Sequence, residues 1–218
     1  MVRQIFEEQI RELLEDLLEM GDMVNGAIQR SIDALAQQDE ELARKVIEFD
    51  DEINAIQQEI DEKCLVLIAT QQPMASDLRI ILAVSAIAGE LERIGDYTEG
   101  IARLAIKLSG RPMLKPLIDI PRMAEESRRM LSIALEAFAR QDVEAARSVG
   151  KADDIVDALY DQVYRELLVF MMEDPRTISQ ATYLLWVAHN LERIADRTTN
   201  IGERVVFIDS GEIVDLNR

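Results

Sequence analysis

The sequence predicts an all-α protein built from two tandem, pseudo-symmetric, antiparallel three-helix bundles, with six long helices in total. Three observations support this prediction. Apolar residues recur at alternating spacings of three and four, the period of a helix buried along one face. Residues that favour helices dominate the chain, whereas aromatic residues make up only 5% of it. The chain also repeats itself at a spacing near 100 residues, which indicates two copies of one structural unit.

The internal repeat is clearest in two segments. Residues 34–51 match residues 137–154 with ten of eighteen positions identical. Residues 91–101 match residues 191–201 with seven of eleven positions identical. Because the two matches lie far apart within each copy, the repeat extends over most of each half of the chain.

The offset between the copies also predicts where the halves meet. It is 103 residues in the first matched pair and 100 in the second, so a small insertion or deletion lies near the loops that contain Pro73 and Pro175. Short connections between long helices make antiparallel neighbours, which gives each half an up-down-up topology. We therefore expect one bundle over residues 1–110 and a second bundle over residues 111–218.

In the first half, helices are expected over residues 4–37, 39–71 and 77–108. Asp39 offers a cap for the second of these helices. Pro73 interrupts the pattern because proline cannot continue a helix interior. Ser76 or Asp77 can then cap the third helix. The repeat predicts the same arrangement in the second half, over residues 117–140, 142–173 and 177–208, with Asp142, Pro175 and Thr177 at the joints.

Two apolar stripes predict how the helices of the first half face one another. The second expected helix carries its stripe at Val46, Phe49, Ile53, Ile56, Ile60, Cys64 and Leu67. The third carries its stripe at Ile80, Val84, Ile87, Leu91, Ile94, Thr98, Ile101, Ala105 and Leu108. Such stripes form the seam of a helical bundle. Cys64 lies within a stripe, so we expect it to be a buried small side chain, with no disulfide available to a single cysteine.

Four pairs of acidic or amide residues are spaced four apart, which places both members of a pair on one helix face. The pairs are Asp50 with Asn54, Glu92 with Asp96, Asp153 with Asp157, and Glu192 with Asp196. Counted from Pro73, Asn54 and Glu92 are both 19 residues away, and Asp50 and Asp96 are both 23 away. Equal counts put residues at the same height in an antiparallel helix pair. The counts around Pro175 are nearly equal in the same way, so we expect two clusters, each on one rim of a bundle.

Gathered carboxylates need a compensating charge. Two unit charges 4 Å apart repel by about 4 kcal/mol at an effective dielectric of 20. A divalent or trivalent cation is the expected partner, and oxygen-only ligands suit iron, magnesium, manganese or calcium rather than zinc. Asn54 replaces an acid and predicts weaker binding in the first cluster. Glu99 and Glu203 are further candidate ligands, and His189 is expected to lie at the surface or outside the ligand shell.

The composition excludes several classes of function. The formal net charge of −18 disfavours nucleic acid and anionic lipid as partners, and favours cations or basic protein surfaces. The N-terminal segment does not resemble a signal peptide, and no apolar run reaches the ~20 residues that span a bilayer, so we expect a soluble protein. No nucleophile–base pair and no Gly-rich phosphate loop is present, which predicts a non-catalytic role.

The chain resembles the PhoU family. The likeness rests on ELERIGD at 90–96 and NLERIAD at 190–196, and extends over VIEFDDEIN at 46–54, QPMASDLR at 72–79, LKPLIDIP at 114–121 and MMEDPRTI at 171–178. The resemblance implies metal-binding helical bundles. It also implies a cytoplasmic negative regulator of the phosphate-starvation response, commonly dimeric or of higher order. Its implied partners are the ATPase of a phosphate ABC transporter and a phosphate sensor histidine kinase.

Two alternatives remain open at this point. A ferritin-type carboxylate protein would bind iron for storage or redox chemistry, but such bundles carry Glu-x-x-His facing the core on two helices. Here the order is His-x-x-Glu, and it occurs once, at His189 and Glu192. A helical scaffold without any metal is the second alternative, in which the acidic pairs are simply solvated flanks.

Overall fold

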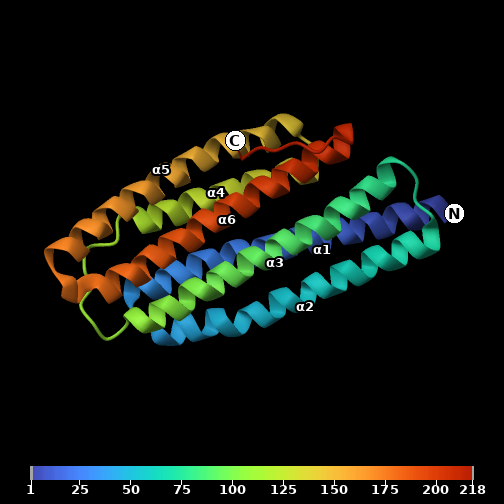
Figure 1. Ribbon diagram of the computed structural model, residues 1–218. Coiled ribbons are helices and arrows are strands. Elements are labelled where there is room, and N and C mark those ends of the chain that lie inside the picture. The colour runs from blue at the N-terminus through green and yellow to red at the C-terminus, as the bar shows by residue number, and fades with distance from the viewer. Residues whose placement is uncertain (1, 218) are drawn as a thin grey trace.

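The computed structural model describes residues 2–217, which form six long α-helices and one short 3-10 helix (Figure 1). They are α1 (Val2–Gln37), α2 (Glu40–Gln71), α3 (Ser76–Leu108), α4 (Asp119–Arg140), α5 (Val143–Glu173), η1 (Pro175–Thr177) and α6 (Ile178–Ser210). The predicted all-α class is confirmed, and each long helix begins and ends within two residues of its expected position.

The six helices form two antiparallel bundles that lie side by side along their length. Helices α1, α2 and α3 make the first bundle, and α4, α5 and α6 make the second (Figure 1). Helix α3 packs against α6 at the centre of the molecule, and α1 contacts α4 beside it. Within the described range, α2 and α5 contact only elements of their own half, so they form the two outer edges. The α2–α3 turn and the α5–α6 turn lie at opposite ends of the molecule (Figure 1).

Two of the predicted helix caps are confirmed. The Asp39 carboxylate accepts a hydrogen bond from the Leu42 backbone N–H at 3.0 Å. The Asp142 carboxylate accepts one from the Ala145 backbone N–H, also at 3.0 Å. Each cap satisfies a backbone donor that the first helical turn leaves without a partner. The repeat thus preserves the start of the second helix in both halves.

The cap predicted for α3 is wrong, whereas Thr177 lies at the joint before α6 as expected. Ala75 occupies the N-cap position of α3 with φ 49°, and no side chain caps that helix. Ser76 and Asp77 already lie inside α3, because the turn after Pro73 brings the helix start forward by one residue. Thr177 does precede α6, but its hydroxyl lies 3.0 Å from the Phe170 carbonyl and donates to the preceding helix instead.

One hydrophobic core runs through both bundles. The α3 stripe is buried from Val84 to Leu108 as predicted, and Cys64 is buried, which raises the pKa of its thiol to about 11. On α2 the prediction is wrong at Phe49 and Ile56, which are only half-buried, and Asp50 is buried beside Phe49. The seam steps from Val46 by four residues to Asp50 before it reaches Ile53.

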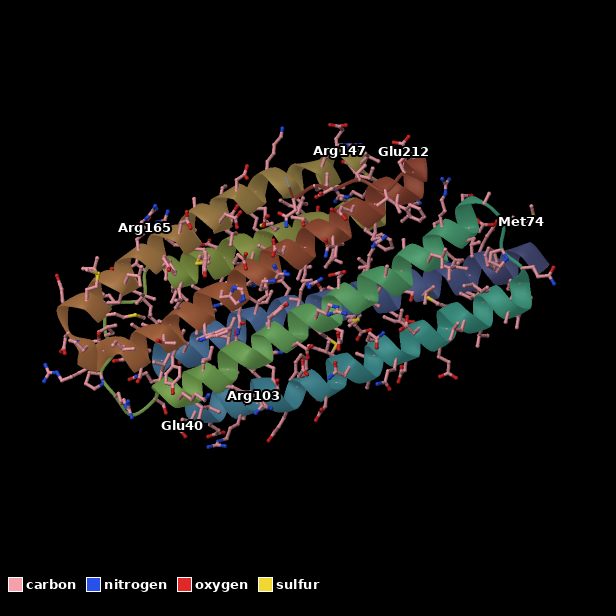
Figure 2. All side chains as sticks on the ribbon, in the orientation of Figure 1. Glu40, Met74, Arg103, Arg147, Arg165 and Glu212 are labelled. Atoms are coloured by element: carbon pink, nitrogen blue, oxygen red, sulfur yellow. The ribbon has the colours of Figure 1, made fainter. Side chains whose placement is uncertain are left out.

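The outer faces of the bundles carry many charged side chains. Figure 2 shows Arg165 on α5 at the outer edge of the second bundle, and Arg103 on α3 beside α2, where it lines a hollow between the two helices. The turn between α2 and α3 presents Met74 at one end of the molecule (Figure 2). Across the described helices, none combines the length and hydrophobicity needed to cross a bilayer.

Candidate metal-binding carboxylate clusters

The first cluster joins α2 to α3 around Asp50. The Asp50 side chain is buried, and its Oδ2 accepts a hydrogen bond from Asn54 Nδ2 at 3.1 Å, while Oδ1 has no hydrogen-bond partner among the described residues. Burial, followed by the charges of Asp96, Glu99 and Glu92, raises the pKa of Asp50 to about 6, although the hydrogen bond from Asn54 lowers it. The predicted residues of the first half therefore act on one another electrostatically, as the matched heights required.

A glycine makes room for this buried carboxylate. A Cβ atom at Gly95 of α3 would lie 3.0 Å from Asp50 Oδ1 and 3.3 Å from a methyl group of Ile53. Real Cβ atoms rarely approach a neighbour so closely, and Gly95 thus lets α3 run close to the acid. The interface between α2 and α3 can hold a polar side chain here because Gly95, on the facing helix, has no side chain.

The second cluster joins α5 to α6 around Asp153. This side chain is 3% exposed, and its Oδ1 has no hydrogen-bond partner in the part of the chain that the structure describes. Burial, followed by the charges of Asp157, Asp196 and Glu192, raises the pKa of Asp153 to about 7. Burial, followed by the charge of Asp196, likewise raises the pKa of Glu192 to about 7. Four acids therefore share one region, as the repeat predicted.

Each cluster has a buried and an exposed side. Asp50 and Asp153 occupy core positions, whereas Asp96 and Asp157 are exposed at the surface. The expectation that all four members of a cluster sit on the rim is therefore wrong for Asp50 and Asp153. Each cluster reaches from the interior to solvent, an arrangement in which an ion can enter from outside and meet a buried acid beneath.

Glu99 belongs with the first cluster more closely than its sequence position suggested. It lies on α3, its charge is the next after that of Asp96 to raise the pKa of Asp50, and it forms a 2.5 Å ion pair with Arg103. Glu99 is seven residues from Glu92, so both side chains lie on one helix face. This spacing is the feature of the sequence that places Glu99 near the cluster. Glu203, the other additional candidate, is engaged differently, because its Oε1 accepts a hydrogen bond from the Leu216 backbone N–H at 3.0 Å.

The C-terminal segment reaches the second cluster. Asn217 Nδ2 donates to Asp196 Oδ1 at 2.7 Å, and Arg193 pairs with Asp196 Oδ2. Hydrophobic periodicity gives no signal for this contact, because residues 211–217 follow the last helix without a regular pattern. Asp196 is therefore partly compensated by protein groups, whereas one oxygen of Asp153 and one of Glu192 lack a hydrogen-bond partner.

His189 lies beside the second cluster. Its Nδ1 is 3.4 Å from Glu192 Oε2, and its side chain is partly exposed. Burial, followed by the charge of Arg193, lowers the pKa of His189. No histidine occupies the matching position in the first half, where Gly89 stands.

The donor chemistry of both clusters fits an oxygen-seeking cation. Buried carboxyl or amide oxygens without hydrogen-bond partners occur on Asp50, Asn54, Asp153 and Glu192. Within residues 2–217, however, no three His, Cys, Asp or Glu side chains already stand in an arrangement that would hold a metal ion together. Hydrogen bonds from Asn54 and Asn217 occupy carboxylate oxygens that a metal would need. Those amides would have to turn away for a metal to bind.

Comparison with known proteins places both halves in one family. The family model described as the PhoU domain matches residues 17–105 and again residues 120–205. A relative from Clostridium acetobutylicum, named a phosphate-specific transport system accessory protein PhoU homolog, is 40% identical over the full length of both chains. The Escherichia coli protein of that system, PhoU, is 36% identical over 95% of this chain and 86% of its own.

Solved structures agree with this family match. The crystal structure of PhoU from Pseudomonas aeruginosa superposes with a TM-score of 0.91 at 38% identity, covering 95% of this chain and all of that one. The phosphate transport system regulatory protein PhoU from Streptococcus pneumoniae gives a TM-score of 0.89 at 32% identity, over 96% of this chain and 99% of that chain.

Proposed function

The chain belongs to the PhoU family, and on that premise we propose that it is a negative regulator of phosphate uptake and of phosphate-starvation signalling. The observation that carries this proposal is that both repeats, over the whole chain, resemble relatives named as accessory proteins of the phosphate-specific transport system. In this role the chain acts in the cytoplasm as a non-catalytic adaptor. It connects the ATPase of a phosphate ABC transporter with a phosphate sensor histidine kinase, and works as a homodimer.

The form of the molecule supports an adaptor role. The long helices offer extended outer faces on α2 and α5, and the net charge of −18 suits docking onto basic protein surfaces. Complementary charge speeds the encounter between partners and suppresses wrong ones. An acidic surface also disfavours direct capture of free phosphate, so we assign the sensing of phosphate to the partners.

We further propose that the two carboxylate clusters bind metal ions. Asp50, Asn54, Glu92 and Asp96 would hold an ion in the first bundle, and Asp153, Asp157, Glu192 and Asp196 would hold one in the second. When bound, a divalent or trivalent ion such as iron, magnesium or manganese neutralises the acids and locks α2 to α3 and α5 to α6. Its role here is structural and regulatory.

The adaptor proposal predicts stable recovery of two membrane-associated partners. The tagged chain is recovered from gently solubilised membranes of its own host, grown with ample phosphate, and the co-purifying proteins are identified by mass spectrometry. A phosphate transporter ATPase and a sensor kinase are expected, well above their level with a tagged, unrelated acidic helical protein. Absence of both, even after cross-linking, would contradict the adaptor role. Deletion of the gene should also raise transporter expression under ample phosphate, whereas a fall would contradict negative regulation.

A further inference from the structure

The second bundle carries an exposed aromatic groove between α5 and α6. Tyr160, Leu185, Trp186 and His189 line a hollow of about 300 Å³. Trp186 leaves 54% of its surface exposed, although a tryptophan gains much of its stabilising effect from burial. A large aromatic side chain held at the surface of a hollow is typical of a recognition site rather than of a core.

The aromatic side chains of the groove are arranged against one another. The Trp186 and His189 rings meet edge to face, with centroids 5.8 Å apart and an interplanar angle of 76°. The Tyr160 ring lies 6.3 Å from that of His189 and 6.4 Å from that of Tyr164. These contacts fix the ring orientations, so the groove is largely formed before anything binds in it.

The internal repeat shows that the fold does not require this groove. At the matching positions of the first bundle, Gln57 replaces Tyr160, Ala86 replaces Trp186 and Gly89 replaces His189. The first bundle instead holds a polar network there, in which Gln57 and Ser85 each donate a 2.5 Å hydrogen bond to Asp61. Only the second copy places aromatic side chains at this site, which indicates a role specific to that half.

Negative charge borders the aromatic lining. Glu192 Oε2 lies 3.4 Å from His189 Nδ1. Burial raises the pKa of Tyr160, and the charges of Glu192 and Asp161 raise it further, so the carboxylates act on the groove electrostatically. Arg193 is the positive charge that lowers the pKa of His189. Its guanidinium is already paired with Asp196 and hydrogen-bonded to Tyr97. Aromatic faces beside carboxylates attract an organic cation and repel phosphate or anionic lipid.

We propose that this groove binds an arginine side chain presented by a basic segment of a partner protein. A guanidinium is planar and weakly hydrated, so it stacks on an aromatic face while the nearby carboxylate charge attracts it. Arginine is also among the residues that most often anchor protein interfaces. This inference rests on the proposed adaptor role and supplies the chemistry of one partner contact.

The chain supplies its own reporter for the test, because Trp186 is its single tryptophan and lines the groove. An acetylated, amidated peptide of alternating arginine and alanine is titrated into the full chain while the Trp186 emission is followed. We expect a saturable change in emission, and binding about tenfold weaker when neutral citrulline replaces arginine. Lysine in place of arginine should weaken binding by a smaller factor.

Two variants locate the binding. Tyr160→Gln installs the residue of the first bundle and keeps Trp186 as reporter, and it should weaken peptide binding by about fivefold or more. Glu62 lies on α2 and lines a separate hollow between α1 and α2. Glu62→Gln removes that acid and should leave binding within about twofold of the unaltered chain. Trp186→Ala, measured by the anisotropy of a labelled peptide, provides a second and independent disruption of the groove.

Three outcomes would overturn the inference. Equal affinity for the arginine and citrulline peptides would show that no cation is recognised. Equal affinity of the unaltered chain and of both groove variants would place the peptide elsewhere. A loss of self-association in Tyr160→Gln, measured by sedimentation without peptide, would show that a second copy covers the groove. If Tyr160→Gln still recovers the transporter ATPase and the kinase from membranes, the adaptor role stands and the groove is not its contact.

Discussion

Asp153 shows how a single residue reveals a conflict between stability and function. An almost fully buried carboxylate with an unsatisfied oxygen is costly, because an uncompensated charge inside a protein loses its hydration. Asp157, Asp196 and Glu192 add repulsion rather than relief. Sequences keep such groups where they are used, since strained and strongly perturbed residues concentrate at functional sites. A bound cation would remove the conflict.

Substitutions in the clusters should alter metal binding and stability in opposite directions. Asp153→Asn removes a ligand charge, so it should weaken Mn²⁺ binding to the second cluster by at least about tenfold. The same change removes a buried charge, so the metal-free protein should melt at a higher temperature at pH 7.5. Asn54→Asp should strengthen Mn²⁺ binding to the first cluster. Equilibrium dialysis and thermal melts followed by circular dichroism measure both effects.

Asp61→Asn is the matched control for these variants. Asp61 lies on α2 outside the clusters and accepts hydrogen bonds from Gln57 and Ser85. Its replacement changes the net charge equally but should leave Mn²⁺ binding unchanged. If Asp153→Asn and Asp61→Asn bind Mn²⁺ as well as the unaltered chain, the clusters are not metal sites, and the scaffold alternative gains support.

At the scale of elements, the sequence predicts the helices well because local signals agree. Asp39 and Asp142 cap helices, Pro73 and Pro175 interrupt them, and the apolar stripes maintain one period throughout. Which of two neighbouring residues faces the core is harder to predict. Hydrophobicity favours Phe49, but the adjacent Asp50 is the buried residue. The room that Gly95 leaves for Asp50, and the groove around Trp186, depend on contacts between helices that no single stripe encodes.

The C-terminal segment is the element that the sequence did not predict, and two glycines accommodate it. Leu216 lies against α5 and α6, where a Cβ atom at Gly150 would be 2.4 Å from its carbonyl oxygen and one at Gly202 would be 3.3 Å from its Cδ1. Glu212, near the start of this segment, lies at the end of the molecule where Arg147 lies on α5 (Figure 2). From there the segment returns along the second bundle to Asp196.

Gly150→Ala should therefore release the C-terminal segment. Alanine stabilises a helix relative to glycine by about 0.5–1 kcal/mol. A Gly→Ala substitution whose new methyl group meets no neighbour should therefore stabilise the protein. Gly89→Ala is the matched control, because a Cβ atom at Gly89 of α3 meets nothing within 4 Å. We expect Gly89→Ala to be stabilising and Gly150→Ala to be less so, with faster hydrogen exchange at the Leu216 amide in the latter only. Equal stability gains with unchanged exchange would contradict this account of the contact.

At the scale of the whole molecule, two sequence repeats share one core. The buried apolar residues of both halves form a single cluster, and α3 against α6 is the central contact between them. Polar groups cross the same interface, since Glu90 of α3 accepts a 3.1 Å hydrogen bond from Asn200 and lies 3.5 Å from Arg197 of α6. The two halves therefore repeat in sequence and in helix arrangement, but they pack together around one shared core.

This packing predicts that the chain unfolds as one cooperative unit. Neither half can expose its α3 or α6 face to water without losing apolar burial of about 25 cal/mol per Å². Glu90→Ala should lower the free energy of unfolding by about 1–3 kcal/mol, because it leaves partly buried donors of Arg197 and Asn200 without an acceptor. Glu15→Ala, in an exposed pair with Arg11, should change it by less than about 0.5 kcal/mol. Calorimetry and urea titration should show one transition for all three proteins, and two separate transitions in the unaltered chain would mean that each repeat is stable on its own.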